Sequence, residues 1–321
     1  MNSEAIGTLH QHLISALSSA PDEARRLFHG RGQCWSGLEH VTADWLQGVL
    51  LVSLFREPSE PELVALKHML MALTESPAWR QSQAQKLLLQ HRYLQDSPTE
   101  FLLGDAVDEW LITENGLRYK LDLGKKQNNG LFLDMRYGRR WVQAQAQGKR
   151  VLNLFAYTCG FSVAAIAGGA EHVVNLDMAK AALSRGRDNH RLNQHDLNRV
   201  SFLGHELFKS WGKVTKYGPY DLIIIDPPSF QKGSFALTKD YQRILRRLPD
   251  LLTAQGTVLA CINDPAVGPD FLIAGMTNEA PSLSFEQRLE NPPEFADINP
   301  DSGLKALVFT QAGRIAANHC A

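Results

Sequence analysis

The chain has few cysteines, and their spacing excludes two kinds of structure. Four are present among 321 residues, and none belongs to a Cys-x-x-Cys pair: Cys34, Cys159, Cys261 and Cys320. Zinc sites and disulfide frameworks both need cysteines in close or regular patterns, so the sequence predicts neither. The histidines also lack partners at the spacing of metal ligands, and we expect no metal ion.

Long apolar runs and a strong net charge are absent as well. No stretch approaches the roughly 20 apolar residues of a membrane helix, and residues 1–20 lack the order of a secretory signal. We therefore expect a cytoplasmic protein with no membrane partner; its oligomeric state is left open, a homodimer included. The net charge is −1, but residues 101–250 carry 22 Lys and Arg against 15 Asp and Glu. Such an excess suits either a solvated face or a polyanion-binding surface.

The pattern of apolar residues divides the chain into three parts. Residues 1–98 show helical spacing, as in Pro58 to Trp79, and predict a smaller, mostly helical N-terminal accessory domain. Residues 99–136 contain two alternating runs joined by Asn115-Gly116, which predicts a linking β-hairpin. Residues 137–321 form the main domain.

One segment of the N-terminal part combines arginine, glycine and aromatic residues. It runs from Arg25 to Trp35 with the sequence RRLFHGRGQCW. Arginines beside aromatic rings can bind phosphates and stack on bases. A glycine-rich loop packed under Trp35 is the plainer interpretation of the same residues.

The main domain alternates strand and helix patterns. Five apolar runs predict parallel strands near 151–155, 172–176, 199–203, 221–225 and 257–262, and two late runs near 283–290 and 304–310 predict an antiparallel pair. This order predicts an α/β fold with a doubly wound, seven-stranded, mostly parallel sheet.

The run from Asp221 to Phe230, DLIIIDPPSF, delivers a carboxylate from a buried strand into a double proline. Pro227 and Pro228 remove two backbone donors and fix two φ angles, so Asp226 and nearby carbonyl groups project from a rigid elbow. Ligands of open α/β sheets bind where such strands end. The elbow can therefore hold an amino or amide group.

A second motif follows the first core strand, where residues 153–162 read NLFAYTCGFS. A turn from a strand into a helix offers free amide donors to a ligand, but this one lacks the Gly-x-Gly-x-x-Gly motif of dinucleotide sites. Asp177 ends the second strand, where an acid suits the hydroxyl groups of a ribose. It could equally serve as a helix cap.

Taken in order, these motifs resemble those of class I S-adenosylmethionine-dependent methyltransferases with a Rossmann-like fold. The sequences at 153–162 and 226–230, with the run from Glu114 to Arg136, are similar to the bacterial large-subunit ribosomal RNA methyltransferases of the I and K/L types. The resemblance covers residues 109–312. It implies an enzyme that uses S-adenosyl-L-methionine and methylates RNA, in rRNA processing or elsewhere.

The resemblance also implies roles for individual residues. The methionine end of the cofactor would be lined by Asn153, Phe155, Tyr157, Thr158 and Gly160. Asp177 would hold its ribose, Met178, His205 and Glu206 would flank its adenine, and Asp226 would lie beside the sulfonium. Family members more often have Asp than Glu in the adenine loop.

The expected acceptor is a nitrogen atom, because a cysteine nucleophile is missing. Cytosine C5 methylation needs a thiolate that adds to the ring, whereas Ser229 and Asn263 occupy the corresponding places here. Guanine N7 has an exposed lone pair, and an exocyclic amine can donate to Asp226 and the Pro227 carbonyl. We expect the catalytic group to be Asp226, Pro227, Pro228, Ser229, Phe230 and Asn263, with Phe230 stacking on the base.

Basic and polar residues near this elbow form a weaker prediction for substrate binding: Gln127, Arg136, Lys232 and Arg243. Phosphate contacts of this kind give affinity for RNA and a steep dependence on salt. Two other functions remain open at this point. One is methylation of a protein amide or a small molecule, and the other is a non-catalytic RNA-binding protein on a methyltransferase fold.

Overall fold

The computed structural model describes residues 1–124, 126–231 and 235–311, which form two compact units. The first unit consists of residues 1–133 and 292–300, and the second of residues 134–291 and the described residues from 301 onward. The linking hairpin thus belongs to the first unit. So does the short segment 292–300, which the sequence pattern assigned to the main domain.

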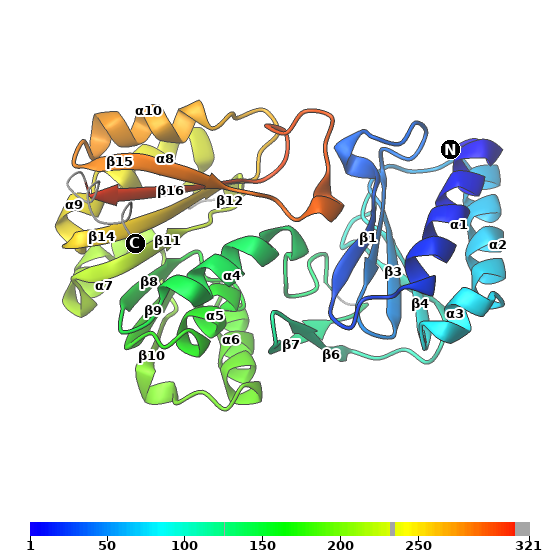
Figure 1. The fold of residues 1–321 in the computed structure, drawn as a ribbon, viewed down its shortest axis with the longest axis horizontal. Coiled ribbons are helices and arrows are strands. Elements are labelled where there is room, and N and C mark those ends of the chain that lie inside the picture. Colours follow the sequence, from blue (N-terminus) through cyan, green and yellow to red (C-terminus); the bar gives the residue numbers. More distant parts are fainter. Residues whose placement is uncertain (125, 232–234, 312–321) are drawn as a thin grey trace, which may run out of the picture. The chain divides into compact units, whose positions relative to one another are not determined.

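A mostly parallel sheet forms the centre of the second unit (Figure 1). Its order is β10-β9-β8-β11-β14-β16-β15, in which β16 runs antiparallel to both of its neighbours. The strands are β8 (Arg150–Leu154), β9 (His172–Leu176), β10 (Val200–Leu203), β11 (Tyr220–Ile225), β14 (Leu252–Ile262), β15 (Leu283–Leu289) and β16 (Lys305–Gln311). The predicted α/β class with its doubly wound sheet is confirmed.

Both faces of this sheet are buried, which explains the continuous apolar runs of its strands. Along β11, Ile223 and Ile225 contribute to one hydrophobic cluster, whereas Leu222 and Ile224 contribute to the other. The helices of the unit are α4 (Arg136–Gln145), α5 (Gly160–Ala167), α6 (Lys180–Leu192), α7 (Trp211–Tyr217), α8 (Leu237–Leu245), α9 (Leu248–Leu251) and α10 (Asp270–Glu279). Side chains of α7 to α10 join the first cluster, and those of α4 and α5 join the second.

Short elements complete the connections between these strands and helices. A two-stranded ribbon follows the Asp-Pro-Pro elbow and consists of β12 (Phe230–Gln231) and β13 (Phe235–Ala236). Single turns of 3-10 helix are η1 (Gly30–Gly32), η2 (Leu133–Met135), η3 (Leu197–Arg199), η4 (Leu207–Lys209) and η5 (Pro293–Phe295). Among the described residues, none of the helices has the length and hydropathy needed to cross a membrane.

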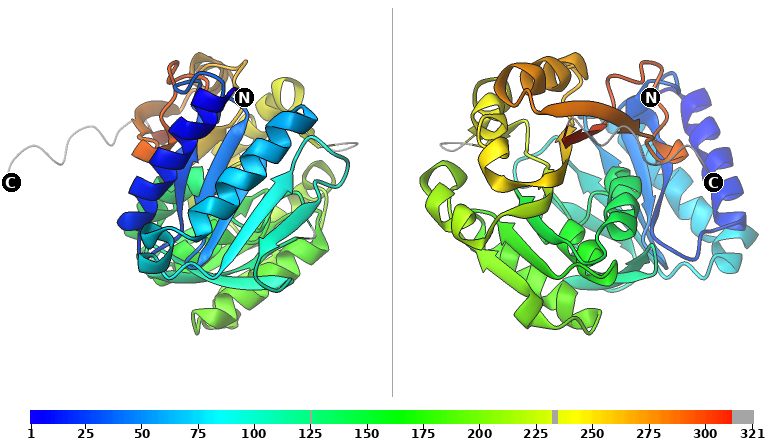
Figure 2. Two further views of the ribbon diagram at one scale, coloured as in Figure 1. Left: turned by 90° about the vertical axis from the view of Figure 1, so that its right-hand side faces the viewer. Right: turned by 60° about the vertical axis from the view of Figure 1, so that its left-hand side comes forward.

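A five-stranded sheet forms the centre of the first unit, with the order β1-β2-β3-β4-β5. The strands are β1 (Arg25–His29), β2 (Val41–Trp45), β3 (Val49–Leu54), β4 (Lys86–His91) and β5 (Thr99–Leu103). Helices α1 (Ser3–Ser18), α2 (Glu60–Thr74) and α3 (Pro77–Gln81) supply the side chains that pack on one face of it (Figure 2).

The expectation of a mostly helical N-terminal domain is therefore wrong. The strand β3 is short and buried along its whole length, and its residues do not alternate between apolar and polar. A short apolar run of this kind cannot be told from a buried helical segment by periodicity. The helix near residue 60 is confirmed, and Ser59 begins it with a capping box to Glu62.

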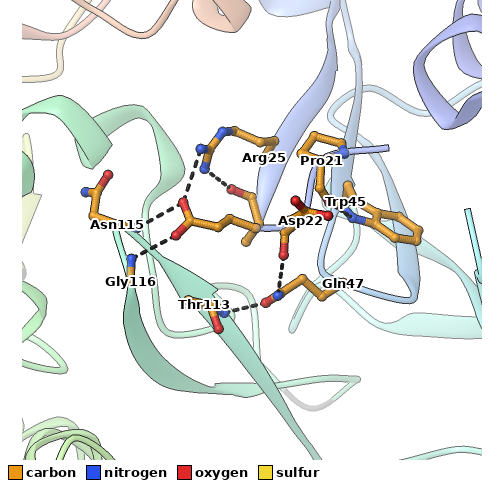
Figure 3. Close-up of polar contacts among 10 residues, drawn as sticks. Pro21, Asp22, Arg25, Trp45, Gln47, Thr113, Asn115 and Gly116 are labelled. Carbon is orange, nitrogen blue, oxygen red and sulfur yellow. Dashed lines mark hydrogen bonds and ion pairs between the residues drawn. The ribbon is translucent and has the colours of Figure 1, made fainter. Parts of the chain in front are cut away.

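The predicted hairpin is also confirmed, as β6 (Glu109–Glu114) and β7 (Leu117–Asp122). Asn115 and Gly116 form its turn with φ values of 51° and 75°, a conformation in which glycine and asparagine are favoured. The hairpin is bound to the sheet of the same unit by the side chains of Glu23 and Gln47 (Figure 3).

Glu23 forms the centre of this attachment. Its carboxylate accepts hydrogen bonds from the backbone N–H groups of Gly116 at 2.8 Å and Asn115 at 3.0 Å, and from Arg25 at 3.2 Å. Burial opposes ionisation, but these three donors outweigh it and hold the pKa of Glu23 below its usual value. The carboxylate thus satisfies two turn donors.

We predict that Glu23→Ala lowers the free energy of unfolding by about 1–3 kcal/mol, because the two turn N–H groups lose their acceptor. Urea unfolding at pH 7 measures the change. The contribution of a carboxylate with a lowered pKa is present above its ordinary pKa of 4.5 and lost as the pH falls through the folded value.

The difference between wild type and variant should therefore shrink in acid. Glu75→Ala, which changes an exposed glutamate of the same unit, serves as the control and should have little effect. An equal loss of unfolding free energy in both variants would contradict the proposal that Glu23 stabilises the hairpin turn.

Candidate active site

The candidate site lies at the carboxyl ends of the parallel strands of the second unit. The chain proceeds outward from β8 through β9 to β10 and then returns to β11 on the other side of β8. In open α/β sheets, the crevice at such a reversal is where ligands bind. The residues that follow β8, β9, β11 and β14 therefore define the site.

The turn after β8 has a strained backbone. Phe155, Tyr157 and Cys159 have φ values of 57°, 49° and 62°, a backbone conformation that residues other than glycine rarely adopt. Gly160 is the first residue of α5, so the turn leads directly into a helix N-terminus. Strained backbone of this kind is maintained by its surroundings and is common where a ligand binds.

Asp177, which follows β9, holds this turn in place. One carboxylate oxygen accepts from the backbone N–H of Tyr157 at 2.8 Å, and the other accepts from Ala179 at 2.7 Å. Burial raises the pKa of Asp177, while the two backbone donors act in the opposite direction. The carboxylate therefore links the ends of β8 and β9.

Behind the turn, a buried chain of polar side chains joins four elements. Asn153 donates to Asn175, Asn175 donates to Ser162, and Ser162 lies 2.9 Å from His190. His190 in turn lies 3.0 Å from His195. Burial lowers the pKa of His190 to about 3 and, with the charge of Arg199, that of His195 to about 4, so this network is uncharged at neutral pH.

A small cavity beside Asp177 has a volume of ≈ 10 Å³, about the room that one water molecule needs, and it opens to solvent. It brings together five of the predicted cofactor residues with three apolar neighbours: Phe155, Asp177, Met178, His205 and Glu206, with Leu176, Leu207 and Phe208. Glu206 caps η4 by accepting from the N–H of Phe208 at 2.8 Å. An acid beside apolar walls suits a nucleoside.

The Asp-Pro-Pro elbow follows β11, as predicted. Burial raises the pKa of Asp226 to about 7, the charge of Asp134 adds to this effect, and Arg139 opposes it. Pro227 is buried, whereas Pro228 and Ser229 are exposed. The side chain of Phe230 lies outside the described structure.

Asn263 follows β14 and is exposed at the same edge of the sheet. Its side-chain amide donates to Asp134 at 2.9 Å, and the hydroxyl of Ser229 donates to its backbone carbonyl at 3.4 Å. Asp134 and Arg139 were missed as site residues. The Gly-x-Phe-x-Asp-x-Arg run from Gly130 to Arg136 was the available signal, since it contains Asp134.

The described cysteines of the second unit are buried and difficult to ionise. Burial raises the pKa of Cys159, and the charge of Asp177 adds to the effect. Burial likewise raises the pKa of Cys261, together with the charges of Asp226 and Asp134. Neither thiol is suited to nucleophilic attack; Cys320 lies outside the described residues.

The described residues that were predicted to bind the substrate lie in different environments. Arg136 is buried, with its guanidinium 4.7 Å from the Tyr137 ring. Arg243 lies 3.8 Å above the ring of Phe208 and is paired with Asp240 at 2.8 Å. Gln127 belongs to the first unit, and Lys232 lies outside the described residues. The part of the chain that the structure describes contains no cluster of three metal-ligating side chains.

Comparison with known proteins identifies the family. A family model described as S-adenosylmethionine-dependent methyltransferase matches residues 25–310. The chain belongs to this family. The methyltransferase is therefore an enzyme whose cofactor is S-adenosylmethionine, and several of the residues predicted to hold that molecule line the cavity described above.

Several named proteins are similar to this methyltransferase. YwbD of Bacillus subtilis, provisionally named a ribosomal RNA large subunit methyltransferase, is 32% identical over 90% of this chain and 74% of its own. Ribosomal RNA large subunit methyltransferase I of Aeromonas salmonicida is 35% identical over 46% of this chain and 39% of its own. The K/L enzyme of Shewanella strain MR-4 is 31% identical over 67% of this chain and 31% of its own.

A solved structure supports the fold. The crystal structure of SMU.776 in complex with SAH has a TM-score of 0.83, covers 96% of this chain and 81% of its own, and is 24% identical. At this level of identity, the similarity shows a shared fold and nothing more specific. The methyltransferase therefore shares its fold with that protein.

We predict that Asp226→Asn removes a pH dependence from the stability of the methyltransferase. An acid whose pKa rises from 3.8 to about 7 on folding destabilises the native state progressively between those two values. The free energy of unfolding of the wild type should therefore fall relative to the variant from pH 4 to pH 7 and stay at a constant difference above pH 7.

Urea unfolding at a series of pH values measures this difference. Asp270→Asn changes an exposed aspartate of the same unit and should give a difference that hardly varies over the same range. A constant difference for Asp226→Asn would show that its carboxyl group is not perturbed by burial.

Proposed function

We propose that the protein methylates a nitrogen atom of a base in ribosomal RNA, with guanine N7 as the leading acceptor and a ring or exocyclic nitrogen as the other. The observation that carries the proposal is the side chain that follows β14. Asn263 stands there, bonded to Asp134, and both described thiols of the unit are buried. C5 methylation of a pyrimidine would need a thiolate in this region.

The RNA substrate is supported by the names of the relatives. YwbD is similar along most of its length, whereas this chain spans less than half of the I-type and K/L-type relatives described above. The proposal therefore takes ribosomal RNA as the substrate class and leaves the modified position to experiment.

We infer that the cofactor lies across the carboxyl ends of β8 and β9. S-adenosylmethionine supplies a methyl group on a positively charged sulfur, which makes the carbon electrophilic without a metal. Asp177 would accept hydrogen bonds from the ribose, and the apolar walls at Met178 and Phe208 would enclose the adenine. The turn at Tyr157 to Gly160 would hold the amino acid part, because it leads into the N-terminus of α5, where the helix dipole favours a carboxylate.

The acceptor base would then lie against Asp226 and Asn263. Methylation at guanine N7 leaves the ring positively charged, so a negative group nearby stabilises the charge that develops. Asp226 with Asp134 can supply it, because the pKa of Asp226 near 7 allows it to ionise when a cation approaches. An exocyclic amine would instead donate to the same carboxylate.

We predict that Asp177→Ala weakens binding of S-adenosylhomocysteine by about 100-fold, equivalent to about 3 kcal/mol, as expected for loss of hydrogen bonds to a charged acceptor. Isothermal titration calorimetry measures the affinity. Asp177→Asn, which retains an acceptor oxygen, should lose less. Asp188→Ala changes a carboxylate paired on the surface of α6 and should bind normally. Undetectable binding by the wild-type protein would refute the cofactor site itself.

The acceptor can be identified from modified nucleosides. Ribosomal RNA from cells with and without the gene is digested, and its methylated nucleosides are compared by mass spectrometry. We expect a methylated guanine to disappear and to return with the wild-type gene but not with an Asn263→Ala variant. Loss of 5-methylcytosine would refute the proposal that the acceptor is a nitrogen atom. If the RNA is unchanged and a labelled methyl group is transferred to a protein or small molecule instead, the proposal that RNA is the substrate is refuted.

A further inference from the structure

The first unit contains a cluster of arginines on an aromatic ring that the proposed chemistry does not use. The guanidinium carbon of Arg31 lies 4.4 Å from the ring centroid of Phe55, and that of Arg92 lies 5.1 Å from the same centroid. Arg31 is exposed, and Arg92 and Phe55 are partly exposed. Two positive charges are thus held against one ring at the surface of the unit.

The sheet of the first unit fixes two members of this cluster. Phe55 and Arg92 directly follow the parallel strands β3 and β4, which are paired in register up to Leu54 and His91. The N–H of Arg92 donates to the carbonyl of Leu54 at 2.8 Å, which continues the ladder by one residue. The two side chains therefore start from adjacent backbone positions at one edge of the sheet.

They also lie on the face opposite the helices. Val52 and Leu54 of β3, and Leu87 and Leu89 of β4, belong to the hydrophobic cluster shared with α1 and α2. Side chains alternate along a strand, so Phe55 and the even-numbered residues of β4 point the other way. Arg92 further donates to the carbonyl of Gln127 at 2.6 Å and to Asn128 at 3.2 Å.

Arg31 is held by its two glycine neighbours. A Cβ atom on Gly30 would lie 1.8 Å from the carbonyl oxygen of Leu38, and one on Gly32 would lie 1.8 Å from that of Ala296. Only glycine fits at either place, so η1 packs tightly and the backbone of Arg31 is fixed in position. The Gly-Arg-Gly sequence therefore holds one exposed guanidinium group at a defined place on the surface.

The segment 292–300 adds apolar and aromatic surface beside the Gly-Arg-Gly segment. The N–H of Ile298 donates to the carbonyl of Gly32 at 2.9 Å, and its side chain is 71% exposed. Phe295 lies 4.7 Å from the guanidinium carbon of Arg26, whose charge is balanced by Asp44.

We propose that the exposed guanidinium of Arg31, oriented by the ring of Phe55 and with the charge of Arg92 beside it, forms a binding surface for the phosphate backbone of the substrate RNA. Guanidinium groups recognise phosphate oxygens through paired N–H donors, and a ring beneath them keeps the planar groups oriented. The neighbouring exposed Ile298 supplies apolar contact for a sugar or base. This inference rests on the proposed function, since it assumes that the acceptor is RNA.

Binding of a labelled single-stranded RNA of about 12 nucleotides, a length within the usual site sizes, tests the proposal. Fluorescence anisotropy gives the dissociation constant at several salt concentrations. Arg31→Glu should weaken binding by at least about tenfold and lower the salt slope by about 0.7 for each phosphate that the variant no longer binds. Arg31→Lys keeps the positive charge but lacks the planar guanidinium group with its paired donors. Its affinity for RNA should lie between that of Arg31→Glu and that of the wild type.

Arg80→Ala is the matched control, because it removes an exposed arginine of the same unit on α3. Each variant is also titrated with S-adenosylhomocysteine, and each should bind it as the wild type does. In methyl transfer to a ribosomal RNA transcript, Arg31→Glu should raise KM and leave kcat unchanged. Unchanged RNA affinity in Arg31→Glu would overturn the proposal, as would an effect of the same size in Arg80→Ala.

The outcomes separate this inference from the proposed function. If the wild-type protein methylates RNA and Arg31→Glu does so with the same KM and salt dependence, only the surface is refuted. If the wild-type protein transfers no methyl group to RNA, the proposed function fails first. Competition by polyglutamate as strong as competition by unlabelled RNA would indicate an acidic protein as the partner and would overturn the choice of RNA.

Discussion

The active-site edge depends on two neighbouring parallel strands whose carboxyl ends are held together. β11 and β14 are paired in register from Leu222 with Thr257 to Ile225 with Ala260, where β11 ends, and β14 continues to Ile262. The hydroxyl of Tyr241 lies 3.3 Å from the carbonyl oxygen of Ile225 and 3.1 Å from that of Cys261, so a single buried donor joins the two strand ends. The double proline offers no N–H to continue the ladder, and the side chains that follow are directed outward from a fixed base.

Burial gives this edge its electrostatic character. Asp226 is partly buried and near the charge of a second carboxylate, Asp134, and both effects favour its protonated form. A partly buried anion gains more than an exposed one when a cation approaches, because less water screens the attraction. In the proposed reaction, the methyl donor with its positive sulfur and a guanine methylated at N7 would both be cations. The perturbed acid would then suit the transfer of positive charge from one partner to the other, and the uncharged network around His190 would add no competing charge.

Those parts of the fold that follow from local pattern were predictable, and those that depend on distant packing were not. The core strands were visible because both faces of the sheet are buried, and the hairpin because Asn115-Gly116 specifies its turn. The sheet of the first unit was missed because fully buried strands such as β3 have no period-two pattern. Asp134 was missed because its partner, Asn263, lies far away in the sequence, and no local rule connects them. The Gly-Arg-Gly segment was ambiguous for the same reason, since Ala296 is what requires glycine at position 32.

The segment 292–300 links the two parts of the chain in a way that affects how the arginine surface can be tested. The chain leaves the second unit after Asn291, packs in the first unit, and returns at Asp301 to form β16. A side chain at Gly32 would displace Ala296 and thereby disturb the connection between β15 and β16, both of which belong to the sheet that carries Asn263. Loss of activity in a Gly32 variant would therefore have two explanations. Arg31 is exposed and lies between the two glycines, so its replacement changes the charge of the proposed RNA-binding surface and leaves that packing in place.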